Sequence, residues 1–117
     1  MGTRASGKGR LRPIDWDALK RSASVVGLLE SVGWKPSGTR RGGSELRGPC
    51  PNHKSRNEAS PIFSVTPSRN IFNCFKCNAA GDVIALAAYL FGIPPEQRVK
   101  AAVQLCKQLG REIPRLP

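Results

Sequence analysis

The sequence predicts an α+β fold in which a small antiparallel β-sheet packs against N-terminal and C-terminal helices. Two short β-type runs, residues 61–66 and 71–73, are separated by the turn signal Pro67-Ser68-Arg69-Asn70. Apolar residues recur at helical spacing before and after this hairpin. Paired Cys and His residues flank the hairpin on both sides, which indicates that a metal site joins its two ends.

The metal site is predicted from two ligand pairs, Cys50-Pro51-Asn52-His53 and Cys74-Phe75-Lys76-Cys77. Each pair is separated by two residues, a spacing at which a tight backbone turn lets both side chains reach one ion. Zn²⁺ prefers four tetrahedral ligands of this kind, and a closed Cys₃His set leaves no position open for water. We therefore expect one structural Zn²⁺ bound by Cys50, His53, Cys74 and Cys77. The predicted architecture is a zinc ribbon, in which the free energy of metal binding stabilises the folded state.

Three other interpretations of the cysteines remain at this point. Disulfides are uncommon in a reducing cytoplasm, where we expect this chain because its N-terminus has no apolar signal-peptide core. A redox Cys-x-x-Cys at Cys74 and Cys77 would leave Cys50 and His53 unexplained. Cys106 is an alternative fourth ligand, although its helical spacing is typical of a small core residue.

Composition and charge favour a partner that is a polyanion. Nineteen Lys and Arg against eight Asp and Glu give a formal net charge of +11. Nucleic acid is the first candidate, and the alternative is that the charge only keeps a small protein soluble. Residues 35–76 hold eight basic and two acidic residues, so the charge concentrates on the ribbon. No run of eighteen apolar residues occurs, which excludes a membrane-spanning helix.

Before the ribbon, residues 1–12 are predicted to be a disordered basic tail. The following domain, residues 13–110, begins with a helix capped by Asp15 or Asp17 and ended by Gly33, with a candidate break at residues 22–24. Residues 35–44 are rich in Gly, Ser and basic residues and are predicted to form a loop. The ribbon core then runs from residue 44 to residue 82, starting with a short strand at residues 45–47.

After the ribbon, residues 78–82 are expected to be a turn into a nearly apolar helix capped by Asp82. A last helix starts at Pro94-Pro95-Glu96 and ends at Gly110. Its apolar face is predicted to consist of Val99, Ala102, Val103, Cys106 and Leu109. Residues 111–117 cannot continue a helix and are expected to be a C-terminal tail.

The order of these signals resembles the N-terminal zinc-binding domain of bacterial-type DnaG-like DNA primases, including phage and plasmid relatives. The motifs that carry the resemblance are Cys50-Pro51-x-His53, Phe63-x-Val65-x-Pro67 and Cys74-Phe75-x-Cys77-x-x-x-Gly81-Asp82-x-Ile84. It covers residues 14–110. The resemblance implies a DNA-binding module that holds the single-stranded template during DNA replication. A separate catalytic domain, which in members of this family follows in the same chain, starts the RNA primer.

This chain by itself is interpreted as non-catalytic, because two-metal nucleotidyl transfer needs converging carboxylates and its eight acids are scattered singly. The expected partners are single-stranded DNA and a primase catalytic domain or replicative helicase of the primosome, with no small-molecule substrate. The alternative is a protein-interaction or regulatory module of a phage or mobile element. Candidate phosphate contacts are Arg47, Lys54, Arg56, Arg69 and Lys76, with Phe72 as a candidate base-stacking residue and Phe63 and Phe75 expected in packing.

Overall fold

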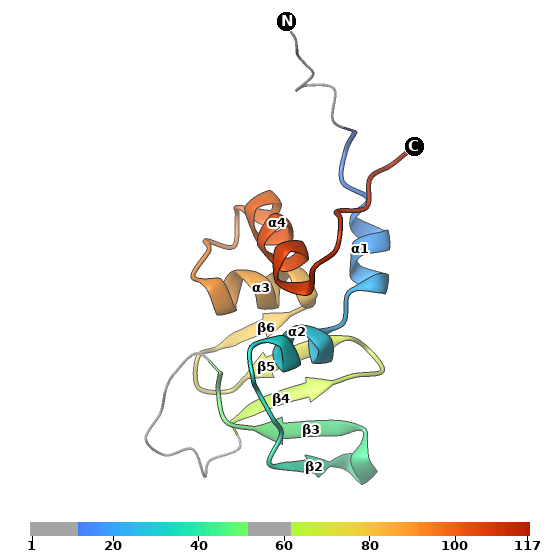
Figure 1. Cartoon of the computed structure of the whole chain (residues 1–117). Helices are drawn as coiled ribbons and strands as arrows, with labels where there is room; N and C mark the ends of the chain where they lie inside the picture. The colour runs from blue at the N-terminus through green and yellow to red at the C-terminus, as the bar shows by residue number, and fades with distance from the viewer. Residues whose placement is uncertain (1–11, 52–61) are drawn as a thin grey trace, which may run out of the picture.

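A single antiparallel sheet, with strand order β2-β3-β4-β5-β6, runs through the molecule (Figure 1). The computed structural model describes residues 12–51 and 62–117. The strands are β2 (Gly38–Arg40), β3 (Glu45–Gly48), β4 (Phe63–Thr66), β5 (Ile71–Cys74) and β6 (Ala79–Gly81). The helices are α1 (Trp16–Ser22), α2 (Val25–Ser31), α3 (Val83–Phe91) and α4 (Arg98–Leu109). The α+β class is therefore confirmed, with α3 and α4 beyond β6 and β2 at the opposite end of the sheet (Figure 1).

The hairpin formed by β4 and β5 is the centre of the sheet. It pairs Phe63 with Cys74 and Val65 with Phe72, so the predicted strands and the turn between them are confirmed. Asn70 closes the turn with a φ of 57°, a left-handed conformation that Asn tolerates better than most residues. Alternation along β4 sends Phe63 and Val65 into the core, where both are fully buried.

Two helices, rather than one, precede the sheet. The Asp15 side chain accepts a hydrogen bond from the Ala18 backbone N–H and caps α1, and Ser24 caps α2 in the same way. Ala23 between them is extended, with φ −105° and ψ 126°. The candidate break at residues 22–24 is thus confirmed. It turns the chain so that Leu19 and Leu28, one from each helix, both enter the core.

The core lies between the hairpin and the helices. Phe63 stacks on Phe72 with ring centroids 5.7 Å apart, and Trp34 meets Phe63 edge-on at 5.6 Å. Helix α3 is capped by Asp82, as predicted, and buries most of its surface against β5, β6 and α4. In the part of the chain that the structure describes, no helix is long and apolar enough to cross a membrane.

Four expectations about the outer elements need correction. Residues 35–44, predicted to be a loop, contain strand β2 and a 3₁₀ turn at Arg41–Gly43, and residues 79–81 form strand β6. Helix α4 starts at Arg98 and is rotated from the predicted face, because Ala101 and Leu105 are buried while Val99 and Val103 are exposed. The last residues are not a free tail, since Ile14 pairs with Arg115 and the Leu116 N–H donates to the Pro13 carbonyl at 2.9 Å.

Candidate metal centre and the surface around it

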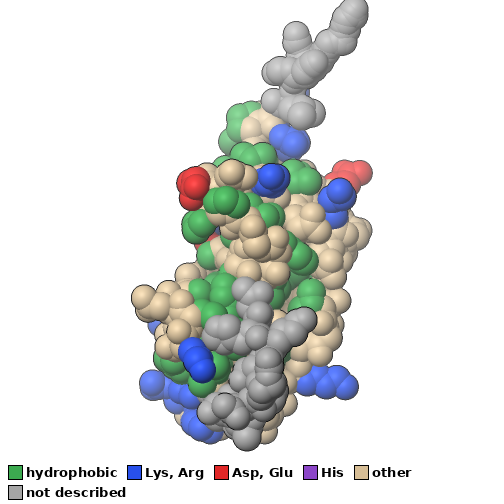
Figure 2. All heavy atoms as spheres, turned by 90° about the vertical axis from the view of Figure 1, so that its left-hand side faces the viewer, with side chains coloured by type: hydrophobic (Ala, Val, Ile, Leu, Met, Phe, Trp, Pro, Cys, Tyr) green, Lys and Arg blue, Asp and Glu red, His purple; other side chains and the backbone are tan. Residues whose placement is uncertain are grey.

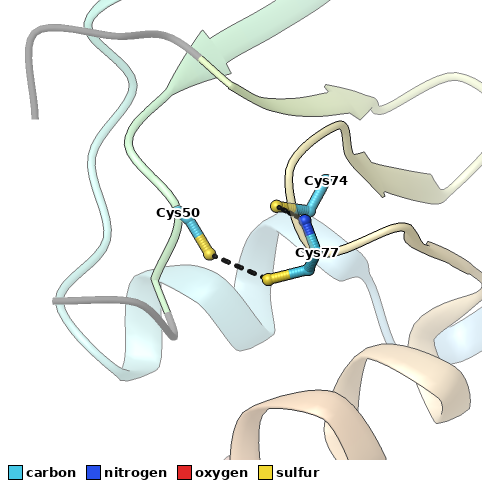
Figure 3. Close-up of side chains that lie close together, drawn as sticks. All are labelled: Cys50, Cys74 and Cys77. Carbon is cyan, nitrogen blue, oxygen red and sulfur yellow. Dashed lines mark hydrogen bonds between the residues drawn. The ribbon is translucent and has the colours of Figure 1, made fainter. Parts of the chain in front are cut away.

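Three cysteine side chains converge where the ends of three strands meet. Cys50 follows β3, Cys74 is the last residue of β5, and Cys77 lies in the turn between β5 and β6. Their sulfur atoms all lie within 4.8 Å of one another, and Cys50 and Cys77 Sγ are 3.8 Å apart. Figure 3 shows the three side chains pointing toward a common point. In the described residues, this is the one group of three or more His, Cys, Asp or Glu side chains that could hold a metal ion.

The spacing of the sulfurs fits Zn²⁺. A tetrahedral ion with Zn–S bonds of about 2.3 Å places neighbouring sulfurs about 3.8 Å apart. The observed separation of Cys50 and Cys77 Sγ, 3.8 Å, has this value. All four cysteines are free thiols, and Cys106 is buried in the core and is not a member of the cluster. The disulfide interpretation and the Cys106 ligand are therefore not supported, whereas His53, the predicted fourth ligand, lies outside the described residues.

The turn that carries Cys77 is shaped by backbone contacts to Cys74. The Cys77 N–H points at the Cys74 sulfur at 3.4 Å, and the Asn78 N–H donates to the Cys74 carbonyl at 3.0 Å. Asn78 then takes a left-handed conformation, with φ 60°, which starts β6. Such N–H donors favour thiolates, which is the form that binds metal.

The two thiols of this turn have different acidities. Burial opposes ionisation of Cys74, but hydrogen bonds from the Cys77 backbone N–H and from the Tyr89 hydroxyl outweigh it, so its pKa is lowered. Burial raises the pKa of Cys77 to about 11. Cys77 is therefore a neutral thiol at pH 7 without a cation. Metal binding must release its proton, so metal affinity depends on pH.

Tyr89, on α3, is the side chain of this centre that reasoning from the sequence missed. Its hydroxyl oxygen lies 2.6 Å from Cys50 Sγ and 3.0 Å from Cys77 Sγ. No spacing rule links a residue twelve positions after Cys77 to the cluster. The one signal is weak: Tyr89 is the one residue with a polar side-chain atom inside the nine-residue apolar helix Val83–Phe91.

The candidate nucleic-acid contacts fall into three groups. Arg69 and Lys76 are exposed, as a phosphate contact requires, while Lys54 and Arg56 lie outside the described residues. Phe72 must be corrected as a stacking residue, because it is 2% exposed and packs on Phe63. The strand register explains why Phe72 is buried, since it pairs with Val65 and lies on the same face of the sheet.

Phe75 was expected in packing but is 54% exposed. It lies in the metal-binding turn, beyond the end of β5, and its N–H donates to the Ile62 carbonyl at 2.9 Å. The Arg47 guanidinium covers part of its ring, with Cζ 4.8 Å from the ring centroid. An exposed aromatic ring with a cation beside it can bind an unpaired base.

A buried carboxylate holds Arg47 in place. Glu45 is 7% exposed, and its Oε2 accepts hydrogen bonds from Arg47 Nε and Ser64 Oγ, each at 2.5 Å. Its Oε1 accepts a third bond from Arg41 Nε at 3.0 Å. These donors, Ser64 first and then the two arginines, lower the pKa of Glu45 to about 2. Arg47 is thus a fixed part of the sheet surface, anchored beside Phe75.

Comparison with known proteins agrees with this site. The family model of the CHC2 zinc finger matches residues 14–116. The DNA primase of Rickettsia felis is 35% identical over 107 residues, 92% of this chain and 16% of that protein. The DNA primase of Geobacillus stearothermophilus is 34% identical over 98 residues, 83% of this chain and 15% of that protein. The chain thus spans about a sixth of the length of these relatives.

A solved structure, of the zinc-binding and RNA polymerase domains of Aquifex aeolicus primase, superposes with a TM-score of 0.64 at 30% identity. It matches 86% of this chain and 22% of that chain. Family, fold and cysteine cluster together show a structural zinc centre. The chain belongs to the CHC2 zinc-finger family, the zinc-binding domain of DnaG-type DNA primases.

Proposed function

We propose that this domain binds single-stranded template DNA during RNA primer synthesis in cytoplasmic DNA replication, as part of a primosome. The observation that carries the proposal is the exposed Phe75 ring beside the guanidinium of Arg47, on the turn that holds Cys74 and Cys77. Single strands are bound by aromatic rings that stack on bases and by cations that follow the backbone. This turn offers both, and the zinc centre makes its position rigid.

The charge around Phe75 supports an anionic partner. Lys76 is its neighbour and is exposed, and Arg40 and Arg41 are exposed on β2 and in the turn after it. On the face drawn in Figure 2, the charged side chains visible at the sheet end are Lys and Arg, and the acidic ones visible lie at the helical end. Glu45 is itself enclosed by Arg41, Arg47 and Ser64 rather than presented to solvent. The backbone of a single strand would therefore meet cations beside the ring.

Nucleotidyl transfer is assigned to another domain or another chain. That chemistry requires several carboxylates around Mg²⁺, and the eight acids of this sequence are spread singly along it. The matching part of the Aquifex primase structure is accompanied there by an RNA polymerase domain. We therefore expect this domain to present template to a primase catalytic domain, and a replicative helicase is a further candidate partner.

The test is binding of a fluorescein-labelled oligodeoxynucleotide, followed by anisotropy across a salt series. Phe75→Ala should weaken binding by about 1–3 kcal/mol, the typical contribution of one stacked base, which is roughly 5- to 150-fold in Kd. The control is Val99→Ala, which removes an equally exposed apolar side chain, 58% exposed, from α4. If the parent protein gave a log K against log[salt] slope near zero, the charge would serve solubility or a protein partner and the proposal would fail.

A further inference from the structure

We propose that Tyr89 is a functional part of the zinc centre, in which its hydroxyl donates a hydrogen bond to a ligand thiolate. The hydroxyl oxygen lies within hydrogen-bonding distance of Cys50 Sγ, at 2.6 Å, and of Cys77 Sγ, at 3.0 Å. These two sulfurs come from opposite halves of the ligand set, 27 residues apart in sequence. Tyr89 therefore links the two halves from a third element, helix α3.

The ring of Tyr89 is fixed in its position by packing. It stacks on Phe63 with ring centroids 6.3 Å apart and lies 5.6 Å from the Phe72 ring. Phe63 pairs with Cys74 across β4 and β5, so the same residues that hold the ring also hold a ligand. The ring is half-buried. A hydroxyl held in this way is pre-organised toward the sulfurs.

The chemistry of the centre favours such a donor. Three thiolates and a neutral imidazole around Zn²⁺ carry a formal charge of −1. A phenol O–H is a neutral donor that can delocalise part of this charge without becoming a ligand. The hydroxyl has one proton, so it donates to one sulfur at a time, and Cys50 Sγ is the nearer. A thiolate that accepts a hydrogen bond is a weaker nucleophile, so the centre should also resist alkylation and oxidation.

The experiment compares Tyr89→Phe with the parent chain, since this change removes the hydroxyl and keeps the ring. We expect Tyr89→Phe to weaken zinc binding roughly 10- to 100-fold in a chelator competition assay, as loss of an outer-shell partner does. In the Co²⁺-substituted protein, the sulfur-to-metal charge-transfer band should move to longer wavelength, because the thiolate becomes more electron-rich. Packing alone would not move that band.

Two controls separate the hydroxyl from general stability. Ser31→Ala removes a hydroxyl that donates to the Leu28 carbonyl at 2.6 Å on α2, away from the cysteines. This change should leave the zinc affinity and the Co²⁺ charge-transfer band unchanged. Far-UV circular dichroism reports whether each variant folds. If Tyr89→Phe folds and shows the parent zinc affinity and the parent Co²⁺ band, the proposal is overturned.

A second measurement needs no substitution of Tyr89. The chain has one tyrosine, so labelling with 3-fluorotyrosine gives a single ¹⁹F resonance. We expect this resonance to shift when Zn²⁺ is exchanged for Cd²⁺, because the hydrogen-bonded sulfur changes its metal bond. A resonance that stays in place would also overturn the proposal. Neither measurement uses DNA, so the outcome is independent of the template-binding function.

Discussion

The side chain of Asn70 caps Val25 across 45 residues of sequence: its Oδ1 accepts a hydrogen bond from the Val25 backbone N–H at 2.7 Å. Its Nδ2 also donates to the carbonyls of Lys20 and Ala23, each at 3.0 Å. One side chain in the hairpin turn thus satisfies backbone groups where α1 ends and α2 begins. This contact, rather than apolar packing alone, sets the position of the two helices on the ribbon.

Asn70→Ala should destabilise the domain by about 2–4 kcal/mol, since three hydrogen bonds are lost and Ala is strained at a φ of 57°. Urea unfolding of the zinc-loaded protein measures the change. Asn70→Gly is the matched control, because it relieves the strain and loses the same three bonds, so it should recover about 1 kcal/mol. Parent stability in Asn70→Gly would show that the cap contributes nothing.

Zinc content should follow the predicted ligand set. We expect Cys74→Ser and His53→Ala each to lose bound zinc and unfold the ribbon, because a closed site needs all four ligands. Cys106→Ala should keep its zinc and cost about 1 kcal/mol, since Cys106 is a buried core residue apart from the cluster. Elemental analysis of the three purified variants is the measurement. Zinc lost from Cys106→Ala but kept in His53→Ala would reverse the assignment of the fourth ligand.

The Glu45 network predicts a specific dependence of stability on pH. The pKa of Glu45 falls from an ordinary 4.5 to about 2 in the folded state, so its contribution is complete above pH 4.5 and is lost as the pH falls toward 2. Glu45→Gln should therefore lower the free energy of unfolding by about 1–2 kcal/mol at pH 7. This is less than the full pKa shift would give, because water screens the charge of the exposed Arg41.

The difference in unfolding free energy between the parent and Glu45→Gln should narrow below about pH 4.5. Acid also removes zinc, but it does so from both proteins, so their difference isolates the carboxylate. A difference that stays constant from pH 7 to pH 3 would show that the pKa of Glu45 is the same in the folded and the unfolded state, so that the network gives the ionised carboxylate no net stabilisation. The Glu45 carboxyl ¹³C shift, followed over the same pH range in the folded protein, measures the folded pKa directly.

Lys76 should contribute to DNA binding mainly through phosphate contact. Lys76→Ala is expected to reduce the magnitude of the log K against log[salt] slope by about 0.7, the value for one phosphate of a single strand. Lys107→Ala, which removes an exposed cation from α4 at the helical end, is the control and should leave the slope nearly unchanged. Equal effects of the two substitutions would mean that total charge, and not the surface around Phe75, governs binding.

Residue spacing by itself predicted the three cysteines of the metal centre, the β4–β5 hairpin, the break between α1 and α2 and the cap of α3. Each of these depends on residues close in sequence: a two-residue spacing, a period of two, a capping side chain. The helix cap at Asp82 is an example, since its side chain bonds the N–H of Ala85, three residues later. Preferences of this kind are encoded in a few neighbouring residues, so they can be predicted without knowing the tertiary structure.

Other features were decided by tertiary structure, because they depend on pairings between distant segments. Strand β2 forms in a Gly-rich segment because β3 offers it a partner, Thr39 opposite Leu46, and its own propensity is poor. Which face of β5 is buried was decided by its pairing with β4, where Phe72 lies opposite the buried Val65. Phe72 and Cys74 are therefore buried, and Asn73 and Phe75, on the alternate face, are exposed. Tyr89 reaches Cys50 only because α3 packs along β5 and β6, which brings residues 39 positions apart within 2.6 Å of each other.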